Sequence, residues 1–305
     1  MVDEGTLRAV EGRVFATDQT ATHDGPGVRM VVYLKGCPLR CVWCHSPESQ
    51  RAAGEIVWYP AKCLRCGACV EACPEGVRSL KGDGAPVEDC TLCGRCLDVC
   101  EHQGLEQKGA VTTAGAVADQ ALRYRKFYDR GRGGVTLSGG EPTLQPEFAT
   151  AVLRLVHAAG LHTAIETTGF VEWDVLAQLS PVVDLFLYDV KHADPNLHER
   201  DTGVTNELIL DNLGRLCEQG SEVLVRVPCI PGRNGTPEII GAIAAEVAAR
   251  GGRRISLLPY NPAAPGKYAW LSRDFALAGT KPQTKREFRE LEQAAAAAGL
   301  ELVAP

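Results

Sequence analysis

Cysteines are the side chains whose type and spacing first indicate chemistry in this chain of 305 residues, which contains 13 of them. Eleven lie between Cys37 and Cys100, and the 205 residues after Cys100 hold only Cys217 and Cys229. A disulfide framework would spread its bridges along the chain, whereas clustered thiols in a reducing compartment are more typical of metal ligands. The clustering therefore predicts local metal centres, with Cys217 and Cys229 as small buried residues.

One spacing of cysteines, C-x2-C-x2-C-x3-C, occurs twice between residues 63 and 100. Bacterial two-cluster ferredoxins have this spacing, in which three consecutive cysteines bind one 4Fe-4S cluster and the fourth binds the other cluster. By that rule the first cluster binds Cys63, Cys66, Cys69 and Cys100, and the second binds Cys73, Cys90, Cys93 and Cys96. We expect Gly67 and Gly94 to leave room for backbone amides near the sulfurs. Zinc is the alternative, but it requires only two C-x2-C pairs, so the double repeat favours iron–sulfur clusters.

A third motif, C-x3-C-x2-C, is formed by Cys37, Cys41 and Cys44 and supplies only three thiolates. A 4Fe-4S cluster held by three thiolates has one iron without a protein ligand. An open coordination position distinguishes catalytic metal sites from closed structural ones. A fourth ligand from His23, His45 or Cys229 would instead close the site.

The elements that must position these cysteines alternate between strand and helix. Strand-like runs cover residues 30–35, 135–138, 163–166, 183–189, 222–228 and 255–259, with helical patterns between the later ones and a final amphipathic helix over 284–298. Such alternation implies parallel βαβ units. Six units are fewer than a closed eightfold barrel needs. The predicted fold is therefore α/β, a partial (β/α)6 TIM-like barrel.

Residues 59–108 do not share this alternation, because they are rich in Cys, Gly and charge. A module of roughly 50 residues is too small to be stabilised by core burial alone and needs metal support. We therefore expect residues 1–58 and 109–305 to form the barrel, and residues 59–108 to form an inserted ferredoxin-like domain.

Composition excludes several classes of protein. The chain is 45% hydrophobic and 23% charged, with 32 Lys and Arg against 38 Asp and Glu, a formal net charge of −6. This balance gives no general attraction to nucleic acid. We find no apolar run of membrane-spanning length and no signal-peptide core near the N-terminus. The sequence predicts a cytoplasmic protein with neither a membrane nor a nucleic acid as its partner.

Polar motifs follow several predicted strands. These are Gly139-Gly140-Glu141, Glu166 and Asp189-Val190-Lys191. Barrel enzymes gather their chemistry at the C-terminal ends of strands, so these residues are candidates for a ligand site. A tight turn would also explain the two glycines, and Asp189 and Lys191 could simply pair with each other. Arg226, inside a predicted strand, is likewise either a residue of the site or a charge that only pairs with a neighbour.

Taken together, the motifs resemble the activating enzymes of glycyl radical enzymes, in the radical S-adenosylmethionine (SAM) superfamily, and specifically the members with a two-cluster ferredoxin insert. The resemblance covers nearly the whole chain in the family's order. It rests on Asp24-Gly-Pro-Gly-Val-Arg29, the C-x3-C-x2-C motif, Ser138-Gly-Gly-Glu-Pro142, Glu166-Thr-Thr-Gly169, Asp189-Val-Lys191 and Leu258-Pro-Tyr-Asn261.

The resemblance implies three 4Fe-4S clusters and bound SAM, whose amino and carboxylate groups would bind the open iron. Implied contacts to SAM come from Trp43, Cys44 and His45 on the adenine side, Gly139, Gly140 and Glu141 near the methionine, Asp189, Val190 and Lys191 near the ribose and carboxylate, and Asn261. Glu166 would support a monovalent cation or the polar end of SAM. Asn261 stands where some relatives have His, so it cannot titrate there. Asp24 and Arg29 are candidates for contact with the protein substrate.

The implied activity is radical initiation. Flavodoxin or ferredoxin would supply one electron, SAM would be cleaved reductively, and the 5′-deoxyadenosyl radical would take hydrogen from a glycine Cα of a partner glycyl radical enzyme. Two alternatives stay open at this point. One is a radical SAM enzyme acting on a small molecule, and the other is a non-catalytic iron–sulfur electron-transfer protein, which would not explain the polar motifs at strand ends.

Overall fold

A nine-stranded sheet organises the molecule, a computed structural model that describes residues 3–79 and 89–304. Its order is β11-β10-β9-β8-β7-β6-β2-β1-β5. The middle strands are parallel and correspond to the six predicted ones: β2 (Arg29–Leu34), β6 (Gly134–Gly139), β7 (His162–Thr167), β8 (Leu185–Asp189), β9 (Val223–Cys229) and β10 (Arg254–Pro259). The prediction of an α/β fold with a mostly parallel sheet is confirmed.

The sheet continues at both ends with strands that the sequence did not predict. β1 (Glu11–Ala21) lies antiparallel between β2 and β5 (Ala110–Thr113), and the short β11 (Glu301–Leu302) adds to β10. Within the described ranges, β5 and β11 do not pair with each other. The sheet is therefore open between these two edges.

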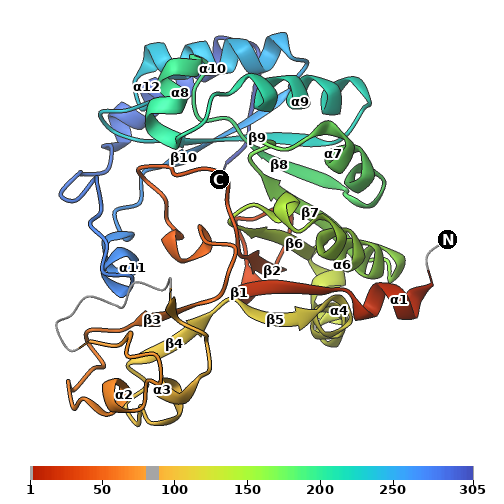
Figure 1. Cartoon of the computed structure of the whole chain (residues 1–305). Helices are drawn as coiled ribbons and strands as arrows, with labels where there is room; N and C mark the ends of the chain where they lie inside the picture. Colours follow the sequence, from red (N-terminus) through yellow and green to blue (C-terminus); the bar gives the residue numbers. More distant parts are fainter. Residues whose placement is uncertain (1–2, 80–88, 305) are drawn as a thin grey trace.

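Helices connect the parallel strands and cover one face of the sheet (Figure 1). Those that alternate with the strands are α6 (Pro146–Ala158), α7 (Trp173–Leu179), α9 (Glu207–Glu218), α10 (Pro237–Ala249) and α12 (Lys285–Ala296). The others are α1 (Glu4–Ala9), α4 (Ala114–Arg123), α5 (Arg125–Arg130), α8 (Pro195–Thr202), α11 (Pro265–Trp270), η1 (Pro47–Ser49), η3 (Pro142–Leu144) and η4 (Ser180–Val182). In α6, Phe148 and Val152 face the main core, and α12 begins at a Thr284 capping box, so both helices lie where the sequence predicts them.

The opposite face of the sheet carries the polar residues. Ala164, Leu187 and Leu224 form a small apolar cluster there. Since side chains alternate between faces along a strand, Glu166 and Asp189, each two residues further along, project on the same side. This face also receives the loop that follows β2, drawn in orange in Figure 1.

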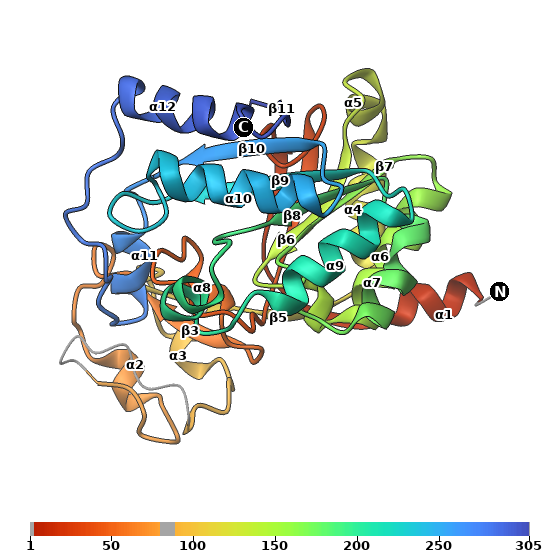
Figure 2. The ribbon, with the colours of Figure 1, turned by 90° about the horizontal axis from the view of Figure 1, so that it is seen from above.

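The segment rich in cysteines extends from a separate two-stranded sheet. β3 (Glu55–Trp58) pairs antiparallel with β4 (Leu105–Lys108), and α2 (Ala68–Glu71) and α3 (Arg95–Asp98) lie between them in the chain. Figures 1 and 2 both show α2 and α3 beyond this hairpin, away from the helices that cover the main sheet. Residues 80–88 of the predicted insert lie outside the described residues.

A membrane-spanning segment was not expected, and the helices in the described ranges are all too short or too polar to cross a bilayer.

Candidate active site and cluster sites

Backbone hydrogen bonds hold the loop of Cys37, Cys41 and Cys44 from three sides. The Gly36 N–H donates to the carbonyl of Ser49 at 2.7 Å, and the Glu141 N–H donates to the carbonyl of Gly36 at 2.7 Å. At the end of α8, Thr202 and Asp201 accept hydrogen bonds from the N–H groups of Arg40 (2.7 Å) and Val42 (3.0 Å). The three thiols are thus presented by a backbone that the surrounding fold already fixes.

Burial has the largest effect on the pKa values of these thiols. It raises the pKa of Cys41 to about 12 and raises the pKa of Cys37 and Cys44 as well. The charges of Glu141, Cys41 and Cys44 raise the pKa of Cys37 further. Because a metal binds the thiolate, cluster assembly at this loop must release protons that the free thiols hold firmly.

An aromatic cluster encloses one side of the loop. Trp43 is 4% exposed and belongs to a buried group with Ile230, Tyr260, Ala264, Tyr268, Phe275 and Leu277, against which Cys41 also packs. The predicted site residues His45 and Asn261 meet here, because His45 hydrogen-bonds the backbone of Asn261. The Asn261 side chain accepts a hydrogen bond from the Ala263 N–H at 3.0 Å.

The polar residues at the strand ends form a connected charge network. Ser138 donates to Glu166 at 2.6 Å, and Arg226 lies 3.2 Å from Glu166 and 3.7 Å from Asp24. Burial raises the pKa of Glu166, and the neighbouring carboxylates act in the same direction against the charge of Arg226. Arg226 is therefore part of the site network and not an isolated buried charge.

Lys191 Nζ lies 2.7 Å from Asp189 Oδ2, as one interpretation of the sequence allowed, and both residues also interact electrostatically with Cys41 of the loop. Burial alone would lower the pKa of Lys191, but Asp189, Cys41 and Cys37 together raise it above its ordinary value. The intervening Val190 is 1% exposed and donates from its N–H to the carbonyl of Arg226. The ammonium group of Lys191 is thus positioned between a carboxylate and two of the predicted cluster ligands.

Glu141 connects the backbone segments around the cysteine loop through its side chain. Its carboxylate is fully buried and accepts five hydrogen bonds, from the N–H and hydroxyl groups of Thr143 and Thr168 and from the hydroxyl of Thr167. A Cβ at the preceding Gly140 would lie 2.1 Å from the carbonyl oxygen of Gly36, so only glycine fits. Together Gly140 and Glu141 lock the ends of β6 and β7 to the start of the cysteine loop.

Arg29 does not have the surface position expected of a contact to a protein substrate. Its side chain is 0% exposed and donates to the Thr136 hydroxyl at 2.6 Å and to the carbonyls of Pro26 and Val135. Burial lowers its pKa to about 10. The expectation for Arg29 is wrong because a guanidinium with enough acceptors can be buried at a strand start.

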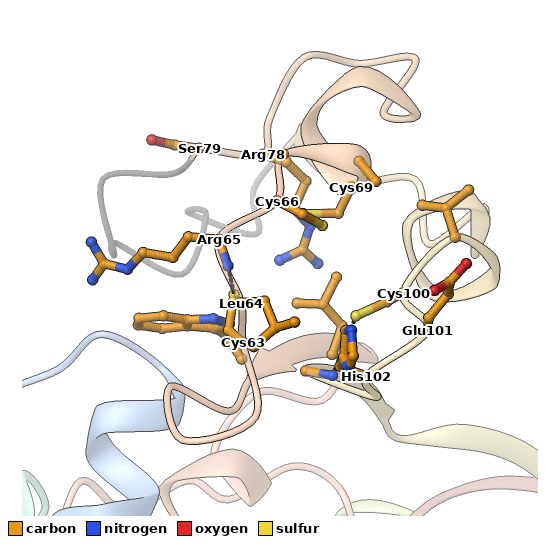
Figure 3. A pocket seen from close by; sticks show the side chains of 16 residues that line it. Cys63, Leu64, Arg65, Cys66, Cys69, Arg78, Ser79, Cys100, Glu101 and His102 are labelled. Carbon is orange, nitrogen blue, oxygen red and sulfur yellow. Dashed lines mark hydrogen bonds between the residues drawn. The ribbon is translucent and has the colours of Figure 1, made fainter.

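The first set of four predicted ligands in the insert surrounds one cavity. Cys63, Cys66, Cys69 and Cys100 all line a cavity of about 270 Å³, and Figure 3 shows them around it. Backbone N–H groups point at two of the sulfurs, from Arg65 to Cys63 at 3.4 Å and from Gly104 to Cys100 at 3.2 Å.

The second set surrounds a smaller hollow of about 10 Å³, lined by Cys73, Cys90, Cys93 and Cys96. Burial tends to raise the pKa of Cys73, but hydrogen bonds from the backbone of Val77, Glu75, Arg78 and Gly76 outweigh it and lower that pKa. Each hollow is thus lined by the four cysteines that the spacing assigns to one cluster, and the binding of the clusters stays a prediction.

The two halves of the insert repeat in conformation as well as in sequence. Arg65 and Leu92, each two residues after a cysteine, both have a φ of 56°, and Gly67 and Gly94 precede α2 and α3 with φ values of 87° and 80°. A Cβ at Gly94 would meet no protein atom within 4 Å. The left-handed backbone therefore favours glycine there. Room for amides near the cluster sulfurs, which the sequence predicts, stays a prediction.

Single-ion metal sites are absent from the parts of the chain that the structure describes, where no three His, Cys, Asp or Glu side chains converge on one point. In a 4Fe-4S cluster each thiolate binds a different iron, so the thiols must surround a space. The cysteines around the larger cavity have this arrangement. The four around the smaller hollow supply the same set of thiols, but its space of about 10 Å³ has to widen before it can hold a cluster.

Comparison with known proteins gives the family. The Radical SAM superfamily matches residues 31–240. The chain is 41% identical over 278 residues to the isethionate sulfite-lyase activating enzyme of Nitratidesulfovibrio vulgaris, covering 88% of this chain and 90% of the relative. It is 37% identical over 288 residues to the choline trimethylamine-lyase activating enzyme of Oleidesulfovibrio alaskensis, covering 92% and 93%. The chain belongs to the glycyl radical enzyme activating enzymes of the radical SAM superfamily.

For the fold, the structure of Streptococcus suis SuiB bound to precursor peptide SuiA aligns with a TM-score of 0.54 at 14% identity, covering 92% of this chain and 49% of SuiB.

A radical SAM activating enzyme uses a 4Fe-4S cluster to cleave SAM and generate a radical on a partner enzyme. The non-catalytic electron-transfer alternative therefore does not describe this chain.

Sequence reasoning missed residues whose role is to support this activating enzyme's site. Asp201 accepts hydrogen bonds from His192 at 3.0 Å and from Arg200 and Arg233, and Asn234 donates to the carbonyl of Lys191 at 2.9 Å. Neither lies in a motif, and no local pattern marks them. Cys229 is buried with its thiol toward the carbonyl of Val227, as predicted, whereas Cys217 is only half-buried because it lies near the end of α9.

Proposed function

We propose that this activating enzyme carries three 4Fe-4S clusters, one for catalysis on Cys37, Cys41 and Cys44 and two in the insert. The observation that carries the proposal is the separation of the cysteines into one fixed loop facing charged strand ends and two four-cysteine hollows. The first insert cluster would be held by Cys63, Cys66, Cys69 and Cys100, and the second by Cys73, Cys90, Cys93 and Cys96.

The catalytic cluster, when bound, supplies the electron that cleaves SAM to methionine and a 5′-deoxyadenosyl radical. The chain's own residues position SAM and exclude water from a reactive species. Trp43 and its aromatic neighbours close one side of the loop, and Cys44, His45 and Asn261 extend that wall. We assign this wall to the adenine.

Lys191 and Asp189 would hold the carboxylate and ribose. The ammonium of Lys191 is buried beside Cys41 and Cys37, where a carboxylate bound at the open iron would meet it. Glu166, with Ser138 and Arg226, offers a carboxylate for a monovalent cation or for the amino group of SAM. Gly139 and Gly140 leave unobstructed backbone at the end of β6.

Glu141 would act on SAM through its neighbours. Both of its carboxylate oxygens are already used by threonines, so it fixes the backbone of Gly140 and the loop of Thr167 and Thr168 in place. Val190 would also act indirectly, because its backbone N–H donates to the carbonyl of Arg226 and so fixes the backbone between Asp189 and Lys191.

The open sheet supports a partial (β/α)6 barrel over residues 1–58 and 109–305, with a ferredoxin-like domain over residues 59–108 on the β3–β4 hairpin. Because β5 and β11 leave the sheet open, a glycine loop of the partner enzyme can enter from outside. A flavodoxin or ferredoxin would supply the electron, in the cytoplasm, and the acidic charge disfavours nucleic acid as a partner.

The proposal is tested on anaerobically reconstituted protein. Three clusters predict about 12 irons per chain. Reduction with dithionite in the presence of SAM should yield methionine and 5′-deoxyadenosine, and mixing with a candidate glycyl radical enzyme should produce the electron paramagnetic resonance doublet of a glycyl radical. A chain with about 4 irons that still activates its partner would refute the two insert clusters.

A further inference from the structure

Arg78 is the charged residue that lines both hollows of the insert, within the residues the structure describes. Its side chain is 8% exposed. In Figure 3 its guanidinium points into the larger cavity beside Cys66 and Cys69, whereas the guanidinium of Arg65 points away from it. Arg78 is therefore a cation held at the boundary between two sites that each contain four thiols.

Arg78 interacts with one cysteine from each set. Its side chain hydrogen-bonds the Cys96 thiol of the smaller hollow. Cys69 of the other set lines the cavity into which the Arg78 guanidinium points. Its charge thus favours negative charge on both sides of the boundary.

The other charged or titratable residues lining the hollows are on the solvent side. Arg65, Glu101 and His102 at the larger cavity and Glu75 at the smaller one are exposed. Water and salt screen exposed charges, whereas a buried charge acts over several ångströms with little screening. Among the described residues that line the hollows, Arg78 is consequently the one buried cation.

We propose that Arg78 raises the reduction potentials of both insert clusters. The inference rests on the proposed two-cluster insert. When a 4Fe-4S cluster accepts one electron from the external donor, no bond forms or breaks and the cluster becomes one charge more negative. A fixed cation stabilises that reduced form and raises the potential. Because one guanidinium lines both hollows, it raises both potentials, which favours reduction of either cluster by the external donor.

The test is a redox titration of the full chain in a Cys44→Ala background, where only the insert clusters are expected to report by electron paramagnetic resonance. In that background about 8 irons per chain are expected. A lower iron content before Arg78 is changed would count against the insert clusters themselves, and so against the proposed function.

With the iron retained, Arg78→Gln should lower both potentials. We expect at least a tenfold fall in the ratio of reduced to oxidised cluster at a fixed potential, which is about 59 mV for a one-electron couple. Arg78→Lys should restore most of the shift, and Arg65→Gln, the exposed control, should shift neither cluster by half as much. Unchanged potentials in Arg78→Gln, or an equal shift in Arg65→Gln, would overturn the inference.

A neutral residue at position 78 could also lower the iron content, because the insert would then no longer hold its clusters. Arg78→Met retains an apolar stem for packing and serves as the second neutral variant. Lower potentials in Arg78→Met with full iron content would support the inference. Loss of iron from both neutral variants but not from Arg78→Lys would overturn it, because the charge would then be needed to assemble the insert and not to set its potentials.

Discussion

The loop of Cys37, Cys41 and Cys44 and the insert hold their thiols in opposite ways. Hydrogen bonds from η1, from the end of β6 and from the end of α8 fix the loop, and Trp43 packs it against a buried aromatic cluster. The insert buries few apolar side chains, and Cys66 and Cys93 are exposed. The loop is thus preformed by the protein, whereas the insert would depend on the clusters proposed for it for its stability.

The largest effect should come from the loop. Cys44→Ala leaves two thiolates, which cannot retain a catalytic cluster, so formation of 5′-deoxyadenosine should fall to background. Liquid chromatography of the reduced reaction with SAM measures this. Cys217→Ala removes a thiol outside every cluster site and serves as the matched control, with activity unchanged. Activity retained in Cys44→Ala would refute the role of the loop.

The next effect should be confined to the insert. Cys66→Ala should lose iron from the insert but keep about 4 irons at the loop, because the loop's backbone does not depend on the insert clusters. With dithionite, SAM cleavage should continue, and with a protein electron donor it should drop by at least tenfold. If Cys66→Ala also stops the dithionite reaction, the two regions are not separable as we describe them.

A third change tests how firmly the fold presents the loop. Glu141→Ala removes the acceptor of five hydrogen bonds and leaves buried threonine hydroxyls without a partner. The free energy of unfolding should fall by about 3 kcal/mol. Equilibrium urea unfolding measures it, with Glu218→Ala at an exposed helix end as the control. A loss as small as the control's would show that Glu141 does not brace the loop.

The smallest expected effect is a loss of folding stability at acidic pH. Burial lowers the pKa of His198, at α8, to about 4, below the ordinary 6.5. The unfolded chain therefore binds a proton that the folded chain does not, and stability is lost as the pH falls through 6.5 toward 4. One such histidine should cost about 2 kcal/mol between pH 7 and pH 5. His198→Gln should reduce this pH dependence, and an unchanged dependence would contradict the assignment.

The parallel core of the sheet and the grouping of the cysteines could be predicted from the sequence because both are local patterns. Apolar runs such as 183–189 and the repeated cysteine spacing need no knowledge of distant residues. β1 was missed because it is rich in polar and charged residues and its partners β2 and β5 are fixed only by the tertiary fold. Arg29 and Arg78 were unpredictable as buried charges for the same reason, since Thr136 and Val135 at Arg29 and Cys96 at Arg78 come from other segments of the chain.

The central claim is that the fixed loop performs the cleavage and that this step does not require the proposed insert clusters. The most direct test measures 5′-deoxyadenosine and iron on the same anaerobic samples of the wild-type chain and of Cys66→Ala and Cys44→Ala, reduced with dithionite. We predict the product from the wild type and Cys66→Ala and none from Cys44→Ala. A wild-type chain with about 12 irons that forms no 5′-deoxyadenosine would contradict this account.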